Sequence, residues 1–141
     1  MKRVLVPLAP GFEEIEAITI IDILRRAGVD VTVAGTVAGP IEASRKTKHL
    51  ADCTLDEVLT QPFDMLILPG GLPGTTHLRN DPRVQTLVKK IRPIAAICAA
   101  PTVLSAAGIL AGRTATSHPS VRAELCAGQT SDEREIRRAH V

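Results

Sequence analysis

The 141-residue sequence predicts an α/β sandwich, that is, a mainly parallel sheet with helices on both of its faces. Short apolar runs alternate along the chain with amphipathic helical segments, which is the arrangement that builds a parallel sheet. Hydrophobic residues make up 45% of the sequence, yet it contains no Trp or Tyr and only two Phe. The core must therefore be aliphatic, and such a core suits parallel strands that are buried on both faces.

The first half of the chain is expected to supply three strands and one long helix. Val4 to Leu8 is the first apolar run, Val31 to Ala34 the second and Met65 to Leu68 the third. The helix is expected from about Glu13 to Ala27, because acids fill its first turn and arginines its last. Its predicted inner stripe consists of Ile15, Ile18, Ile21 and Leu24.

The segment between the second and third strands is less regular. Ile41 to Ala51 is expected to form short strands or a hairpin. Thr54 and Glu57 have the spacing of a capping box, which indicates the start of a short helix.

The second half continues the alternation. Asp81 and Pro82 are typical of a helix start, and this helix is expected to end near Ile91. The elements after it are a strand at Ile94 to Ile97, a helix at about Ala100 to Ala107, a strand at Thr114 to Ser117 and a helix to about Cys126. The sequence thus predicts one α/β domain over residues 1–126 and a polar tail over 127–141, either a loop or a lone charged helix.

Composition and charge exclude several classes of function. The formal net charge is only +2 and no basic stripe with interleaved aromatic residues is present, so no nucleic-acid partner is expected. No apolar run reaches the roughly 18 residues of a membrane span, and the N-terminus does not resemble a signal peptide. Three cysteines without a CxxC pair are typical of a reduced, cytoplasmic protein. No cofactor or metal site is predicted, since His49 and Cys53 have helical spacing in a segment that is not expected to be helical.

Candidate functional residues follow the strands of the predicted sheet. Glu16 lies in the helix after the first strand, Gly70 and Gly71 follow the strand at 65–68, Cys98 follows the strand at 94–97 and His118 the strand at 114–117. Open parallel sheets bind ligands outside the carboxyl ends of their strands. These four segments are therefore expected to meet at one edge of the sheet.

Cys98 stands between a buried strand and the start of a helix. A residue in this position sits on a sharp turn, as nucleophile elbows do. The positive end of the helix dipole favours a thiolate there, and the thiolate is the reactive form of cysteine. On position alone, a buried and inert cysteine explains the pattern equally well.

The other candidates have structural interpretations too. Gly70-Gly71 could let backbone amides approach a ligand, but a bare glycine pair is more often a turn. Glu16 has the acidic neighbours Glu13 and Glu14, and the pattern cannot choose among three acids in a first helical turn. His118 could be structural or solvated.

Four stretches of the sequence resemble the ThiJ/PfpI family. They are Ala9-Pro-Gly-Phe-Glu-Glu-Ile-Glu16, Leu68-Pro-Gly-Gly71, Ala95-Ala-Ile-Cys-Ala-Ala-Pro101 and Thr116-Ser-His-Pro119, and the resemblance runs from Lys2 to about Leu125. Within the family the sequence is similar to the YajL-like branch, which includes the Parkinsonism-associated protein deglycase. The resemblance implies a flavodoxin-like, three-layer sandwich.

The resemblance also implies a role for each candidate residue. Cys98 matches the nucleophilic, oxidation-sensitive cysteine, and Glu16 matches the buried, protonated acid that hydrogen-bonds to its sulfur. Gly71 and Ala99 match residues whose backbone amides face a bound oxyanion. His118 matches a nearby histidine, often too distant to act as a direct base.

Further positions complete the expected site. Arg26 and Arg45 match residues that meet near the site across a homodimer interface, and Gly70 is expected to lie close to the substrate. Protease-like members carry His directly after the cysteine, whereas Ala99 stands there in this chain, so a Cys-His protease dyad is disfavoured. Cys53 does not fall on the family's nucleophile position.

The implied activity is hydrolysis of glyoxal and methylglyoxal, or of their early adducts on proteins and nucleotides, without glutathione. Two alternatives use the same sequence differently. The chain could be an oxidative-stress sensor or redox-regulated chaperone acting through Cys98, or it could be an inactive, truncated homologue. The second alternative arises because similar proteins continue through another strand and a long helix, so that the C-terminal strand and helix of the family are expected to be missing.

Overall fold

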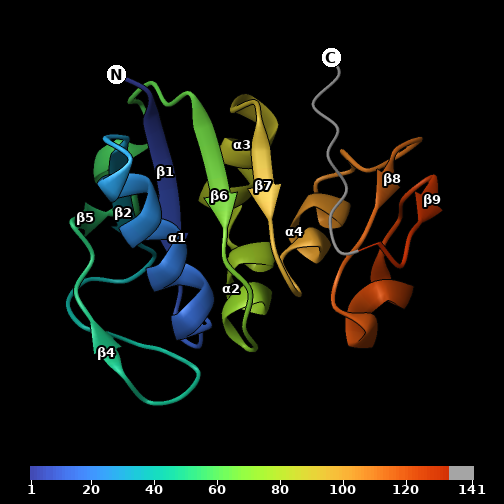
Figure 1. The fold of residues 1–141 in the computed structure, drawn as a ribbon, viewed down its shortest axis with the longest axis horizontal. Coiled ribbons are helices and arrows are strands. Elements are labelled where there is room, and N and C mark those ends of the chain that lie inside the picture. Colours follow the sequence, from blue (N-terminus) through green and yellow to red (C-terminus); the bar gives the residue numbers. More distant parts are fainter. Residues whose placement is uncertain (134–141) are drawn as a thin grey trace.

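A five-stranded parallel sheet forms the centre of the computed structural model, which describes residues 1–133 (Figure 1). The strand order is β5-β2-β1-β6-β7. The strands are β1 (Arg3–Leu8), β2 (Asp30–Gly35), β5 (Cys53–Thr54), β6 (Met65–Leu68) and β7 (Ile94–Ala96). All four neighbouring pairs are parallel. The prediction of an α/β fold with a mainly parallel sheet is confirmed.

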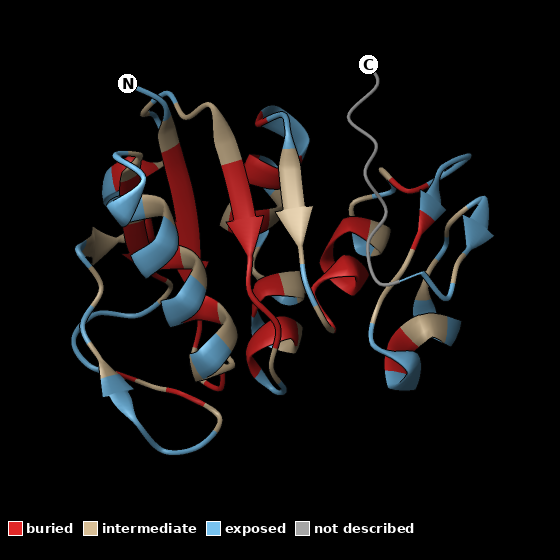
Figure 2. Ribbon diagram, in the orientation of Figure 1, coloured by how far each residue is buried: buried red, intermediate tan, exposed pale blue. Residues whose placement is uncertain are grey.

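Helices cover both faces of this sheet. Successive residues of a strand point to opposite faces, and from Val4 to Leu8 in β1 both sets are apolar. Val4, Val6 and Leu8 of β1 belong to the apolar layer under α1 (Glu14–Arg26). Leu5 belongs to the layer on the other face, under α2 (Gly74–Asn80), α3 (Pro82–Lys90) and α4 (Pro101–Ala106). Figure 2 shows β1 buried between the two layers and β7 only half-buried at the edge of the sheet.

The face that α1 turns toward the sheet differs from the predicted stripe. Ile15 and Ile18 are 75% and 40% exposed, so their assignment to the inner stripe is wrong. The helix instead buries Ala17 and Ile21, one turn apart, with Leu24 partly buried beside them. The small side chain of Ala17 lets the helix backbone lie close to the strands. A helix with isoleucines on several sides does not indicate which stripe is buried.

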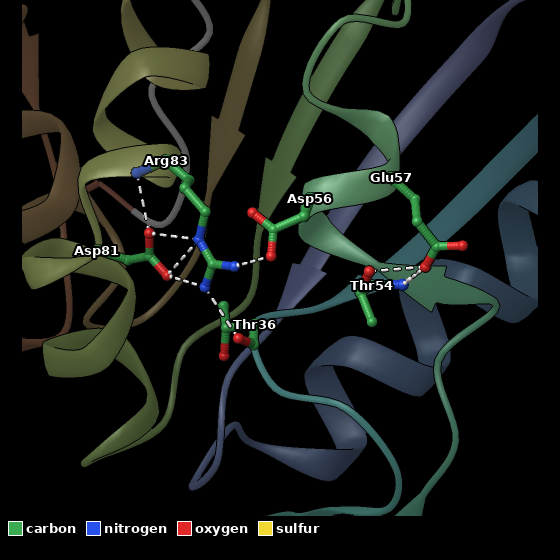
Figure 3. A network of polar contacts seen from close by, with 6 residues as sticks. All are labelled: Thr36, Thr54, Asp56, Glu57, Asp81 and Arg83. Carbon is green, nitrogen blue, oxygen red and sulfur yellow. Dashed lines mark hydrogen bonds and ion pairs between the residues drawn. The ribbon is translucent and has the colours of Figure 1, made fainter.

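Two short elements connect β2 to β5 and β6. The expected hairpin consists of β3 (Ile41–Glu42) and β4 (Lys48–His49), which pair antiparallel. The expected capping box opens η1 (Leu55–Val58), a 3-10 helix in which the Glu57 carboxylate accepts a hydrogen bond from the Thr54 amide at 2.6 Å (Figure 3).

An ion-pair network ties three loops together at the carboxyl edge of the sheet (Figure 3). Asp81 caps α3 by accepting from the Arg83 amide at 2.9 Å, and it also binds the Arg83 guanidinium at 2.6 Å. The same guanidinium donates to Asp56 at 2.6 Å and to the Thr36 carbonyl at 2.9 Å. Burial of Asp81 opposes its ionisation, but the hydrogen bonds from Arg83 prevail and lower its pKa. The network fixes where η1 and α3 stand relative to β2.

The strand predicted at Thr114 to Ser117 does not join the central sheet. The observed β8 (Thr114–Ala115) pairs with β9 (Gln129–Thr130) in a separate two-stranded sheet, so the expectation of a sixth central strand is wrong. A Cβ on Gly128 would lie 2.8 Å from the Cα of Gly112, and this close approach of two glycines lets the segments pair.

Other parts of the C-terminal region also differ from the sequence expectation. The predicted helix after His118 is a 3-10 helix, η2 (Pro119–Glu124), and β9 lies in the region expected to be a loop or a lone helix. Helix α2 was not predicted at all. Residues 134–141 of the predicted polar tail lie outside the described residues. Among the helices of residues 1–133, none has both the length and the apolar character that a bilayer crossing requires.

Candidate active site

Cys98 occupies a strained turn between β7 and α4. Its φ is 59°, in the left-handed region that side-chain-bearing residues rarely adopt. The strand ends at Ala96 and the helix begins at Pro101, so the turn is very short. The carbonyl oxygen of Cys98 accepts a hydrogen bond from the His118 amide at 2.8 Å. The backbone on both sides of the half-buried thiol is therefore fixed.

The amide of Ala99 is the one amide of this turn that faces the sulfur. The Ala100 amide donates to Ile97, and Pro101 has no N–H. The next amide, that of Thr102, turns back to the Ala99 carbonyl at 3.1 Å. The start of α4 therefore offers the sulfur a single donor, rather than the several free N–H groups that a helix N-terminus usually presents.

A second donor comes from the loop after β6. The amide of Gly71 faces the same sulfur. Gly71 has a φ of 97°, and a Cβ there would lie 2.4 Å from the Glu13 nitrogen, so only glycine fits. Neither the Gly71 nor the Ala99 amide has another hydrogen-bond acceptor within residues 1–133.

Glu16 is the acid that reaches the thiol, a choice that the sequence pattern left open. Its side chain is hydrogen-bonded to Cys98, and its Oε2 accepts from the Gly70 amide at 2.9 Å. Glu13 instead caps α1 by accepting from the Glu16 amide at 2.8 Å. Glu14 binds the β3–β4 hairpin, where it accepts from the Arg45 amide at 2.6 Å. The three neighbouring acids thus have three different structural tasks.

Gly70 packs against both Glu16 and Cys98. A Cβ at this position would lie 2.5 Å from Glu16 Oε2 and 2.6 Å from Cys98 Cβ. The Gly70 carbonyl also accepts from the Glu13 amide at 2.9 Å, which ties the loop to the start of α1. Gly70 therefore positions the acid beside the thiol, in addition to the predicted proximity to substrate.

The electrostatics of Cys98 are less simple than the predicted helix-dipole effect. Burial raises the pKa of the Cys98 thiol, and the negative charge of Glu16 raises it further, whereas the amides of Gly71 and Ala99 lower it. The net direction is upward while Glu16 is ionised. Two influences on a Cys98 thiolate therefore oppose each other: the negative charge of Glu16 disfavours it, and the two amides favour it.

His118 contacts Cys98 through its backbone, and its exposed ring is engaged elsewhere. The ring Nδ1 accepts from the Ser120 amide at 3.2 Å and lies 2.7 Å from the Ser120 hydroxyl. This makes His118 the N-cap of η2. The contact of Ser120 with His118 was not predicted. The one sequence signal for it is a Ser two residues after a His.

The two predicted arginines do not join the Cys98 cluster within one chain. Arg26 lies at the far end of α1 from Glu16, about 15 Å of helix rise away, and it pairs with Asp22 at 2.9 Å. Arg45 lies in the β3–β4 hairpin with its side chain exposed. Their meeting across a homodimer interface stays a prediction.

Metal ligands do not gather anywhere in the part of the chain that the structure describes. Within residues 1–133, no three His, Cys, Asp or Glu side chains form a cluster that could hold a metal ion. The groups gathered at the Cys98 site are a thiol, a carboxyl group and two amide donors.

The chain that carries this site was compared with known protein families. The sequence profile of the DJ-1/PfpI family matches residues 2–140. The chain belongs to the DJ-1/PfpI family. The resemblance seen in the sequence is thus confirmed, under another of the family's names.

Individual members of the DJ-1/PfpI family are similar over most of this chain. The Parkinson disease protein 7 homolog of Danio rerio is 44% identical over 134 residues, covering 90% of this chain and 70% of the relative. The glutathione-independent glyoxalase DJR-1.2 of Caenorhabditis elegans is 39% identical over 132 residues, again 90% and 70%. The crystal structure of Drosophila melanogaster DJ-1beta superposes with a TM-score of 0.92 at 40% identity, covering 97% of this chain and 77% of that one.

Proposed function

We propose that the protein is a Cys98-dependent hydrolase that converts glyoxal and methylglyoxal, or their early adducts on proteins and nucleotides, to hydroxy acids without glutathione. The observation that carries the proposal is the grouping of one thiol, one hydrogen-bonded acid and two free amides around Cys98. A relative at 39% identity is named a glutathione-independent glyoxalase, which supports the same substrate class.

The proposed mechanism begins with addition of the thiolate to the aldehyde carbon of methylglyoxal, forming a carbon–sulfur bond and an alkoxide. The amides of Gly71 and Ala99 donate to this oxygen, and Glu16 supplies its proton. The Glu16 carboxylate then removes the proton from the former aldehyde carbon and returns it to the neighbouring carbon. This shift oxidises the first carbon and reduces the second, so that no external oxidant is needed. Water cleaves the resulting thioester, releasing lactate and the thiol.

The test of this proposal is lactate formation from methylglyoxal in the absence of glutathione. The wild-type protein is expected to turn over, whereas Cys98→Ala is expected to be inactive although it folds. Full activity in the Cys98→Ala variant would sink the proposal. Glycolate formation from glyoxal provides a second substrate in the same assay.

A second candidate function is a peroxide sensor or redox-regulated chaperone, favoured by the same two free amides. They could hold the oxygen atoms of a sulfinate formed on Cys98. Mass spectrometry after mild peroxide treatment tests it. Selective oxidation at Cys98 is expected, and uniform oxidation of all three cysteines would contradict it.

We also propose that two copies of the chain associate. Ile15 and Ile23 on α1 and Leu50 after the hairpin are exposed apolar side chains, which an interface between two copies would remove from water. Light scattering after gel filtration is expected to give twice the chain mass of 15.0 kDa, and a value of one chain mass would contradict it.

We further propose that the protein is cytoplasmic. The three unpaired cysteines suit a reducing environment.

A further inference from the structure

Two polar side chains, Thr75 and Thr102, are almost completely buried at the ends of two different helices. Their exposed fractions are 0% and 5%, and they are the two polar residues of the buried class within residues 1–133. Thr75 lies in the first turn of α2 and Thr102 in the first turn of α4. A buried hydroxyl destabilises the fold unless it is hydrogen-bonded, so the partners of these two groups matter.

Each hydroxyl donates to the carbonyl of a residue that serves the thiol. Thr75 Oγ1 donates to the Gly71 carbonyl at 2.7 Å, and Thr102 Oγ1 donates to the Ala99 carbonyl at 2.7 Å. Gly71 and Ala99 are the residues whose amides face the Cys98 sulfur. The two buried hydroxyls and the two amide donors therefore belong to the same two residues.

The fold itself does not need these hydroxyls to satisfy the carbonyls. The backbone amide of Thr75 already donates to the Gly71 carbonyl at 2.8 Å, and that of Thr102 to the Ala99 carbonyl at 3.1 Å. A valine has the same shape and would avoid burying a polar group. The second hydrogen bond on each carbonyl restricts rotation of that residue, which matters most at Gly71, where no side chain limits the backbone.

We propose that Thr75 and Thr102 are positioning residues that hold the Gly71 and Ala99 amides in the direction of the Cys98 sulfur and of an oxygen on the substrate. This inference rests on the proposed function of the site. It predicts that each hydroxyl favours negative charge at Cys98 without touching the substrate.

The variants Thr75→Val and Thr102→Val remove the donor and keep the side-chain shape. The pKa of Cys98, measured by the pH dependence of iodoacetamide labelling in the Cys98 peptide, is expected to rise in both. For each variant kcat/KM for methylglyoxal is expected to fall by about 3- to 10-fold, mostly in kcat, the size of effect that one neutral hydrogen bond has. Thr75→Ser and Thr102→Ser retain the donor and are expected to restore both values.

Thr86 provides a matched control on α3. Its hydroxyl donates to the Pro82 carbonyl at 2.9 Å, a bond of the same kind on an exposed helix. Thr86→Val is expected to leave the Cys98 pKa and kcat/KM unchanged. Thermal melting of every variant separates loss of fold from loss of position, and Thr75→Ala and Thr102→Ala replace any valine variant that does not fold.

The labelling readout does not depend on turnover. If the wild-type protein forms no lactate, the proposed function fails, yet the rise in the Cys98 pKa still tests the positioning role. Folded valine or alanine variants whose Cys98 titrates as in the wild type would overturn the inference, as would equal rises in the serine variants.

Discussion

Cys98 and Cys53 are both half-buried thiols, and their surroundings differ in one respect. Burial raises the pKa of each, and acids add to the effect: Glu16 at Cys98, and Glu57 with Asp52 at Cys53. At Cys98 two backbone amides face the sulfur and oppose this rise. The Cys53 sulfur instead lies 4.0 Å from the Val33 carbonyl oxygen, which accepts the proton of a neutral thiol. We therefore expect the donors for its charge to distinguish Cys98 from Cys53, since burial beside an acid is common to both.

The largest expected effect comes from removing each thiol in turn. Cys98→Ala is expected to lower methylglyoxal turnover by at least about 1,000-fold, since the covalent step is lost. Cys53→Ala, which removes the thiol on β5, is expected to keep wild-type activity. Lactate release by both variants, measured with the melting temperature, checks the contrast. Comparable losses in the two would break it.

Removing the charge of the neighbouring acid is expected to separate acidity from activity. In Glu16→Gln the Cys98 pKa is expected to fall, because the carboxylate raises it, while turnover falls by about 100-fold for lack of a proton carrier. The matched variant Glu57→Gln is expected to lower the Cys53 pKa and leave turnover unchanged. Peptide-resolved labelling with a lactate assay measures both. A higher Cys98 pKa in Glu16→Gln would contradict the electrostatic account.

A methyl group at Gly70 is expected to disturb the site through space alone. The added Cβ would meet Glu16 Oε2 at 2.5 Å and Cys98 Cβ at 2.6 Å, so Gly70→Ala should destabilise the fold by about 1–3 kcal/mol and reduce turnover more than tenfold. Gly108→Ala is the control, because its Cβ would meet nothing within 4 Å. Because the φ of Gly108 is positive, Gly108→Ala should lower the stability of the fold by only about 1 kcal/mol. Its activity should equal that of the wild type. Chemical denaturation compares the two.

The smallest effect is expected at the Asp81–Arg83 network, whose hydrogen bonds reach Asp56 and Thr36 but not Cys98. Asp81→Asn keeps the helix cap but loses the ion pair, for an expected loss of about 1 kcal/mol. The folded-state pKa of Asp81 lies below its ordinary 3.8. Its stabilising contribution is thus complete above that value and is lost as the pH falls through the lower folded pKa. The free energies of unfolding of wild type and Asp81→Asn should therefore converge in acid. Cys98 labelling at neutral pH should stay unchanged, and a shifted Cys98 titration would show that the two regions are coupled.

The parallel sheet and the Cys98 turn could be predicted because local patterns determine them. Apolar runs of strand length and the Cys98 position after Ile94 to Ile97 need no tertiary information. The stripe on α1 could not be predicted, since Ala17, rather than the larger Ile15, packs on the strands. Nor could the pairing of β8 with β9, which depends on Gly112 and Gly128 lying together.

The chemistry of the site could be predicted only in part. The family resemblance pointed to Glu16, Gly71 and Ala99, and the structure brings these around Cys98. The upward shift of the Cys98 pKa was not foreseen, because it depends first on burial of the thiol and then on the charge of Glu16 beside it. The roles of Thr75 and Thr102 depend on burial and on single hydrogen bonds, which no spacing in the sequence encodes.

The most direct test of the central claim is labelling of Cys98 and Cys53 by iodoacetamide in one sample of the wild-type protein, resolved by peptide across the pH range. The two amide donors at Cys98 predict that it reacts at a lower pH than Cys53, whose thiol instead donates to the Val33 carbonyl. If Cys98 reacts at the same pH as Cys53 or at a higher one, the account of a nucleophilic Cys98 is contradicted.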